Sequence, residues 1–181
     1  MRKVLYLFGQ LNDEDVEWIT ENGQKRALDA GQVLIRQGVP VDALFFLLRG
    51  KLSVHLGAAE REIARLNVGE IVGEMSFVDA RPPSATVRSS TAALVFALDR
   101  ALLLAKLDRD MGFAARFYKA LAIYLSTTVR ERHRALGYGS QGDLEELVEE
   151  DDVDELDPNV LDTVALAGDR FDRMMKALTE D

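Results

Sequence analysis

The chain has 181 residues, 48% of them hydrophobic, which suits one substantial core but is too few for two full-sized domains. It contains no cysteine, which excludes disulfides and thiolate metal sites and leads us to expect a reducing, cytoplasmic location. No apolar run approaches the ~20 residues that cross a bilayer, so no membrane partner is expected.

The net charge of −9 is concentrated at the C-terminus. Residues 139–181 contain 15 acidic and 3 basic side chains, whereas residues 1–138 contain 16 acidic and 19 basic ones. A nearly neutral body with a tail that repels phosphate argues against DNA as a partner. We therefore divide the chain into a body, 1–138, and an acidic linker with a last helix, 139–181.

A short first helix is predicted at 13–22, because Asn12 and Asp13 are good N-cap residues, acids fill the first turn and Asn22-Gly23 ends the pattern. Short strands follow at 27–30, 33–35, 44–48 and 51–56, separated by turns that contain glycine. Such glycine-cornered strands are typical of an all-β barrel or roll.

The two histidines do not predict a metal site. Alternation along the last of these strands directs His55 outward to solvent. His133 lies far away in a charged stretch of a predicted helix. Two distant histidines without cysteine do not make a transition-metal site.

Helical periodicity returns near Asp99, with a short helix at 101–106 and a long one at 111–136. The long helix has two apolar stripes: Phe113, Phe117, Leu121, Tyr124 and Thr128 form one, and Ala114, Tyr118, Leu125 and Val129 form the other. Two interpretations remain open. Either one stripe packs on the roll while the other pairs two copies in a homodimer, or both form a single wide core-facing surface.

The tail begins with a glycine-rich break at 137–142, and its acidic run at 149–157 is interpreted as a solvated segment. Asp157 as N-cap and Pro158 at the first helical position begin a last helix, 157–179. Its apolar positions are Leu161, Val164, Phe171, Met175 and Leu178. This apolar face must be buried, either on the chain's own body or dimer, or in the groove of a protein partner.

The segment most informative about function is 68–89. A strand that ends at Val72 is followed by Gly73, which permits a sharp turn, and by a helical turn at 74–78 whose free N–H groups can face an anion. Residues 84–86 add N–H groups and a hydroxyl near the same point. No hydrolytic triad, metal-ligand cluster or phosphate-binding GxxxxGK loop is present, so we expect no catalytic residues, no cofactor and no enzymatic activity.

The order and spacing of these features resemble the cyclic nucleotide-binding domain family, as in the catabolite activator protein. The resemblance covers about 130 residues and rests on Gly73-Glu74, on Ser84-Ala85, on LFFLLRG at 44–50, on the glycine corners and on the long helix. It implies a mainly β fold with flanking helices, a jelly-roll-like cyclic-nucleotide-binding-type β-roll, across 1–138. It also implies a regulatory module and not an enzyme.

The resemblance further implies a role for each matching residue. Glu74 would accept the ribose hydroxyl, while the N–H groups of Gly73, Ser84 and Ala85, with the Ser84 hydroxyl, would hold the cyclic phosphate. Thr128 falls near the position that contacts the base. Met75 and Ser76 complete the candidate ligand-binding turn. The plain alternatives are that Glu74 is an ordinary helix-start carboxylate and that Thr128 is a helix-surface residue.

One position departs from the family pattern, because Pro83 stands where the phosphate-binding arginine falls. A shielded guanidinium–phosphate contact contributes about 2–3 kcal/mol, or roughly 30- to 150-fold in affinity. Two arginines lie near this position. Arg81 is a candidate to reach inward from the loop and replace the lost charge, whereas Arg88 is expected to face outward or to support the strand.

Two functions therefore remain open. The first is a stand-alone sensor of cAMP or cGMP that signals to a partner protein, which the intact Gly73-Glu74 and Ser84-Ala85 pairs favour. The second is a degenerate β-roll that binds no nucleotide and serves as an interaction scaffold, which Pro83 favours. A DNA-binding regulator is not expected, because the acidic residues after the long helix include no basic recognition helix.

Overall fold

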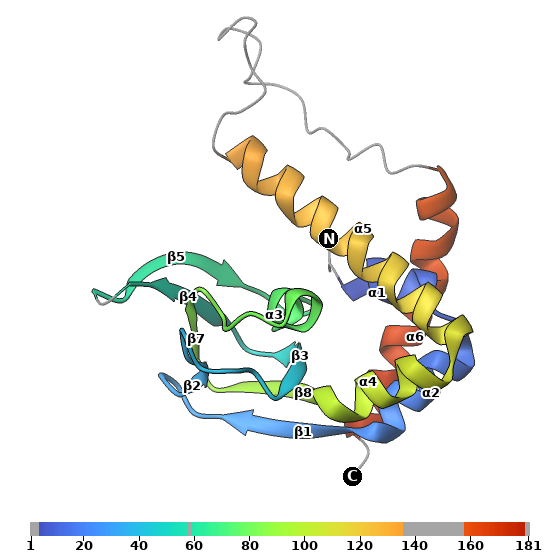
Figure 1. Cartoon of the computed structure of the whole chain (residues 1–181), viewed down its shortest axis with the longest axis horizontal. Coiled ribbons are helices and arrows are strands. Elements are labelled where there is room, and N and C mark those ends of the chain that lie inside the picture. Colours follow the sequence, from blue (N-terminus) through green and yellow to red (C-terminus); the bar gives the residue numbers. More distant parts are fainter. Residues whose placement is uncertain (1–3, 58, 136–157, 180–181) are drawn as a thin grey trace, which may run out of the picture.

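The computed structural model describes residues 4–57, 59–135 and 158–179. Two antiparallel four-stranded sheets form a roll, and the helices other than α3 gather at one end of it (Figure 1). This arrangement confirms the predicted β-roll with flanking helices. None of the described helices is long and apolar enough to cross a bilayer.

The first sheet has the order β1-β8-β3-β6 and the second the order β2-β7-β4-β5. The strands are β1 (Gly23–Leu28), β2 (Val33–Ile35), β3 (Ala43–Arg49), β4 (Leu52–Leu56), β5 (Arg61–Leu66), β6 (Ile71–Val72), β7 (Thr86–Ser89) and β8 (Ala93–Asp99). The predicted strands are present, although β1 begins directly at Gly23. A Cβ on residue 23 would lie 2.0 Å from the Phe96 ring, so only glycine fits at this position.

Strand β3 is buried on both faces, as its uninterrupted apolar sequence requires. Phe45 and Leu47 point into the core between the two sheets. Leu44, Phe46 and Leu48 point the other way, into a second core that the helices cover. One strand therefore holds the roll and the helical layer together.

The helices are α1 (Val4–Gln10), α2 (Asp13–Asn22), α3 (Glu74–Asp79), α4 (Arg100–Arg109), α5 (Met111–Ala135) and α6 (Pro158–Thr179). The predicted helix at 13–22 is confirmed as α2, with a capping box between Asn12 and Asp15. Asp15 is buried and also binds Arg116 of α5, with Oδ2 2.6 Å from Nε. Helix α1 has no counterpart in the sequence-based prediction.

The first predicted stripe of α5 packs inward. Phe113, Phe117, Leu121 and Tyr124 are all buried in the helical core. In the second stripe Ala114 is buried and Leu125 half-buried, whereas Tyr118 and Val129 are 47% and 49% exposed. The two stripes thus differ in burial, and a homodimer through residues 111–136 remains a prediction.

Helix α6 folds back onto the chain's own helices, one of the two alternatives predicted for it. It lies against α1 and α2 (Figure 1), with Ala167, Phe171 and Met174 buried. Phe171 and the half-buried Met175 belong to the predicted apolar face. The side chains of Leu161, Val164 and Leu178, and the linker at 139–157 with Asp157, lie outside the described residues.

A buried guanidinium fixes α6 in place. Arg170 is 8% exposed and donates hydrogen bonds to Asp13 Oδ1 at 2.7 Å and to the Phe8 carbonyl at 3.1 Å. The hydrogen bond from Arg170 lowers the pKa of Asp13. The nearby positive charge of Arg173 lowers the pKa of Asp13 further. A carboxyl with a lowered pKa stabilises the fold above its unfolded pKa of about 4 and loses that contribution as the pH falls.

The predicted outward, solvated position of His55 is only partly correct. The residue is half-buried, and its Nδ1 and Nε2 lie 2.8 Å from the Glu60 carbonyl oxygen and 2.9 Å from Ser53 Oγ. His55 shares its face of β4 with Ser53, as the predicted alternation requires, and these two contacts keep its ring from being fully solvated. The side chain of His133 lies outside the described residues.

The docking of α6 is tested by replacing Arg170 with methionine. We expect the free energy of unfolding to fall by about 1–3 kcal/mol, because the buried Phe8 carbonyl loses its donor. The matched control is Arg173→Met, which removes an exposed partner of the same Asp13 and should change stability by less than about 0.5 kcal/mol. Urea denaturation measures both, and equal effects would contradict the assigned role of Arg170.

Candidate functional site

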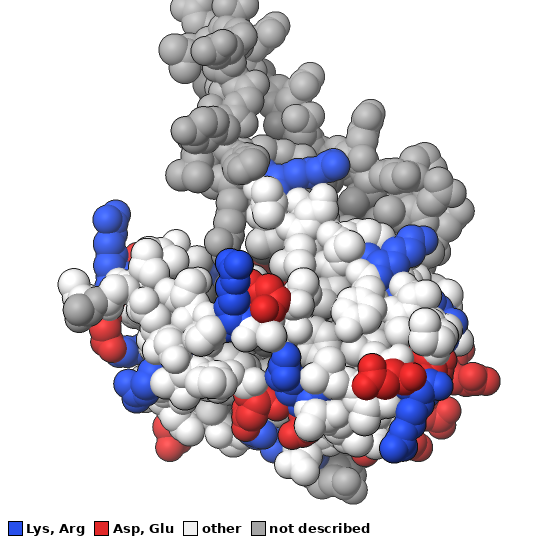
Figure 2. Space-filling view, in the orientation of Figure 1, with Lys and Arg blue, Asp and Glu red and all other residues white. Residues whose placement is uncertain are grey.

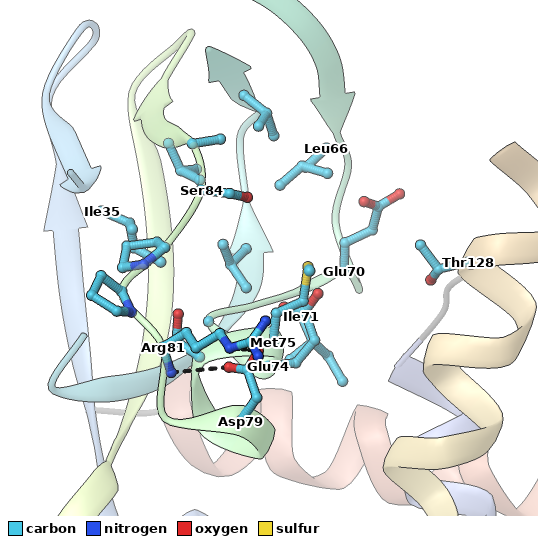
Figure 3. Close-up of a pocket in the computed structure, with 18 of the residues that line it drawn as sticks. Ile35, Leu66, Glu70, Ile71, Glu74, Met75, Asp79, Arg81, Ser84 and Thr128 are labelled. Atoms are coloured by element: carbon cyan, nitrogen blue, oxygen red, sulfur yellow. Dashed lines mark hydrogen bonds and ion pairs between the residues drawn. The ribbon is translucent and has the colours of Figure 1, made fainter. Parts of the chain in front are cut away.

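A cavity of about 310 Å³ opens beside α3, between the loop at 79–85, strand β5 and helix α5 (Figure 3). The structure brings every predicted ligand-binding residue to its wall. These residues are Gly73, Glu74, Met75, Ser76, Arg81, Pro83, Ser84, Ala85 and Thr128. They come from three separate parts of the sequence, so the fold and not sequence proximity assembles them.

Gly73 forms the sharp turn into α3 that the sequence predicts. Its φ is +95°, a left-handed conformation that disfavours other residues. A Cβ at this position would also lie 3.0 Å from the Ala43 carbonyl oxygen of the neighbouring β3. Both constraints reserve the position for glycine and place Glu74 at the cavity edge.

The loop that closes the cavity presents free donors. The N–H groups of Ser84 and Ala85 make no hydrogen bond within the described part of the chain. Figure 3 shows the Ser84 hydroxyl directed into the cavity. The preceding Pro83 is fixed by its carbonyl, which accepts a hydrogen bond from Gly38 N at 2.9 Å. These donors suit an anion or a hydrogen-bond acceptor.

Carboxylates outnumber cations around the cavity. Glu70, Glu74 and Asp79 line it, whereas Arg81 is the one lysine or arginine among the described residues of the lining. Arg88 faces away, as predicted, and pairs with Glu60, its Nη2 lying 2.5 Å from Oε2. Glu70 and Asp79 were not predicted to belong to the site, because the motif contains no signal for them.

Tyr124 clamps α5 to the strand that forms the cavity wall. Its hydroxyl donates to the Ile71 carbonyl at 3.0 Å and accepts from Ile71 N at 3.3 Å. Burial, together with the negative charge of Glu74, raises the pKa of this phenol. The sequence placed Tyr124 on one of the two apolar stripes of the long helix but gave no indication that it lines the site.

Thr128 lies one helical turn beyond Tyr124 and faces the cavity (Figure 3). Its Oγ1 is buried and makes no hydrogen bond with any described residue. Oγ1 is close enough to the Tyr124 hydroxyl to lower the pKa of that phenol, but the two do not meet the geometry of a hydrogen bond. A buried hydroxyl without a partner is unfavourable, so a polar ligand atom here would satisfy it.

The rest of the wall is apolar. Strands of both sheets contribute aliphatic side chains: Ile35, Val54, Ile63, Leu66, Val72 and Val87. A ligand that pairs an apolar surface with a few polar atoms matches such a lining. Among the described residues, no group of three or more histidine, aspartate or glutamate side chains could hold a metal ion.

The charge distribution on one face of the molecule is mixed. On the face in Figure 2 lysine and arginine side chains alternate with aspartate and glutamate, with wide neutral areas between them. This face has no continuous basic area of the kind that contacts a phosphate backbone.

Residues 25–110 match the family described as Cyclic nucleotide-binding domain. A cyclic AMP receptor protein of Thermus thermophilus is 34% identical over 106 residues, which are 57% of this chain and 49% of that protein. A putative potassium channel protein of Rhodopseudomonas palustris is 30% identical over 111 residues, 61% of this chain and 27% of that one. The chain therefore spans half or less of the length of these relatives.

A solved structure shares the fold. A cyclic nucleotide-binding domain from Methylobacillus flagellatus superposes with a TM-score of 0.67 and 24% identity, covering 78% of this chain and 85% of that one. The likeness includes the β-roll and its flanking helices, and at this identity it concerns the fold alone.

The Tyr124 clamp predicts a specific alkaline instability. A phenol whose pKa is raised by folding stabilises the protein below the unfolded pKa of about 10, and stability then falls by up to about 1.4 kcal/mol per pH unit above it. We expect Tyr124→Phe to cost about 1 kcal/mol at pH 7 and to flatten this alkaline loss. Urea titrations from pH 8 to 11 measure it, with exposed Tyr118→Phe as control; parallel pH profiles for both variants would contradict the clamp.

The turn at Gly73 gives a second prediction. Gly73→Ala should destabilise the protein by about 1–3 kcal/mol, because it combines left-handed strain with a steric contact. Gly31→Ala is the matched control, since Gly31 has φ +82° but open space around its Cα. Thermal unfolding should show the larger loss for Gly73→Ala, and equal losses would mean that the contact with Ala43 is unimportant.

Proposed function

Since residues 25–110 of this chain form a domain of the cyclic nucleotide-binding family, we propose that it binds a cyclic nucleotide, cAMP or cGMP, in the cavity beside α3. In this proposal the protein is a regulatory module and not an enzyme, and it passes the binding event to a partner protein. One observation carries the proposal. One cavity is lined by the Glu74 carboxylate, by the N–H groups of Ser84 and Ala85, which make no hydrogen bond with described residues, and by the buried Thr128 hydroxyl.

Each of these groups fits one part of the proposed ligand. The half-buried Glu74 carboxylate accepts from the ribose hydroxyl. The free N–H groups of Ser84 and Ala85 and the Ser84 hydroxyl bind the cyclic phosphate. The unsatisfied Thr128 Oγ1 contacts the base, while the aliphatic wall packs against it.

The cavity volume of about 310 Å³ lies at the lower end of the range for small-molecule sites. The name of the Thermus thermophilus relative favours cAMP over cGMP as the first ligand to test. The weak point of the site is Pro83, which supplies neither charge nor N–H. We therefore expect binding to be weak.

The binding signal has a defined route in this proposal. A base that bonds to Thr128 favours one position of α5, and Tyr124 couples α5 to the cavity wall at Ile71. Helix α5 packs on α1, which in turn carries α6. A ligand that prefers one α5 position over another shifts this helical layer, and α6 presents the change to the partner.

The alternative function is a scaffold that binds no nucleotide. Pro83 and the three carboxylates around the cavity favour it, because they disfavour a phosphate. In that case the exposed part of α5, including Tyr118 and Val129, is the surface for assembly.

The proposed function is tested by calorimetric titration with cAMP and cGMP. We expect saturable binding that weakens at least tenfold in Glu74→Ala, while Pro83→Arg tightens it by up to roughly 30- to 150-fold, the contribution of a shielded guanidinium–phosphate contact. Glu62→Ala is the control, since Glu62 is an exposed carboxylate of β5 that does not line the cavity. No heat from wild type or Pro83→Arg up to millimolar ligand would support the scaffold instead.

A further inference from the structure

The cavity must balance the charge of a phosphate with very little positive charge of its own. A cyclic phosphodiester carries one negative charge, and the cavity lining already holds Glu70, Glu74 and Asp79. Like charges in one site raise the cost of binding. Among the described residues of the lining Arg81 is the one cationic side chain, so the availability of its guanidinium should affect the affinity for phosphate.

Arg81 is engaged by a neighbouring carboxylate. Its backbone N–H donates to Asp79 Oδ1 at 3.0 Å, and its Nε lies 3.8 Å from Asp79 Oδ2. The tight geometry comes from Ala80 between them, which has φ +56° at the end of α3. Figure 3 shows the Arg81 side chain lying along α3 beside Asp79, below Ser84.

The loop keeps the guanidinium within reach of the free donors at Ser84. Ser84 follows Arg81 by three positions, which limits the distance between their Cα atoms to about 11 Å. Pro82 and Pro83 between them restrict how far the loop can extend. A small rotation of an 83% exposed side chain brings its Nη groups toward a phosphate at Ser84, but it breaks the ion pair with Asp79.

We propose that Asp79 is an affinity-lowering residue of this site: it holds Arg81, a cation at the cavity wall, and a ligand phosphate must displace the carboxylate to bind. This inference rests on the proposed nucleotide function. It assigns the phosphate contact to Arg81 in place of position 83, and it gives Asp79 the opposite effect on affinity.

The size of the effect follows from exposure. Arg81 and Asp79 side chains are 83% and 44% exposed, and ion pairs of this kind are worth at most about 1 kcal/mol. Releasing Arg81 should therefore tighten binding by about two- to fivefold. Removing Arg81 itself should weaken phosphate binding by a similar or larger factor.

A double-mutant cycle measures the coupling between the two residues. The proteins are wild type, Arg81→Gln, Asp79→Asn and the double variant, each titrated with cAMP and with adenosine, which lacks the phosphate. Asparagine keeps the Oδ1 acceptor for the Arg81 N–H, so Asp79→Asn removes the charge and retains the turn. Both side chains are exposed, and thermal midpoints close to that of wild type establish that every variant is folded.

We expect Asp79→Asn to tighten cAMP binding two- to fivefold and to leave adenosine binding unchanged. Arg81→Gln should weaken cAMP binding without affecting adenosine, and in its background Asp79→Asn should have a smaller effect than in wild type. Raising the salt concentration should reduce all of these differences.

Several outcomes would overturn the inference while leaving nucleotide binding intact. Equal cAMP affinity for wild type and Arg81→Gln would mean that Arg81 does not contact the phosphate. Weaker binding by Asp79→Asn would mean that the carboxylate positions the guanidinium and does not compete for it. If Asp79→Asn had an equal effect on cAMP affinity in wild type and in Arg81→Gln, Asp79 would act only by repelling the phosphate directly and not through Arg81. No binding of cAMP by any of the four proteins would overturn the proposed function itself, and the inference with it.

Discussion

The burial of β3 on both faces is the constraint on which the rest of the structure depends. One face of the strand closes the core between the sheets, and Val72 of the adjacent β6 lies in the same core and leads into the cavity. The other face forms the base of the helical layer through Phe46, whose ring lies 6.2 Å from that of Phe8. Because a single strand belongs to both cores, the helical layer and the core beneath the cavity are packed on the same element.

The sequence predicted the features that local chemistry determines. The glycine at position 73 and the cap of α2 are required by backbone geometry alone, so their pattern is visible without tertiary information. The elements it did not predict depend on distant contacts. Helix α1 is only seven residues long, too short for a clear period, and exists because Val4, Leu7 and Phe8 are buried against α5 and α6. The ring of His55 likewise contacts the Glu60 carbonyl in the turn between β4 and β5, which alternation along one strand does not reveal.

In the candidate site, too, the residues of a local motif were predicted and the residues placed by distant contacts were not. The residues of the α3 turn and of the loop at 84–85 were predicted because the family motif contains them, and they do share one cavity. Glu70, Asp79 and Tyr124 were missed because their place in the wall depends on how β6, α3 and α5 pack, which a motif does not encode. That Glu70, Glu74, Asp79 and Arg81 line the same cavity is a property of the folded chain alone.

The docked position of α6 has a consequence for any partner of this helix. The helix is covalently attached to the surface that it covers, so the chain's own body competes with a partner for the inner face of α6. Arg170 adds a further barrier, since lifting the helix exposes an aromatic face and separates a buried guanidinium from the Phe8 carbonyl. A partner that binds the inner face of α6 must therefore outcompete an intramolecular interaction. A partner that binds the outer face, where Asp169 and Asp172 are exposed, does not have to displace the helix.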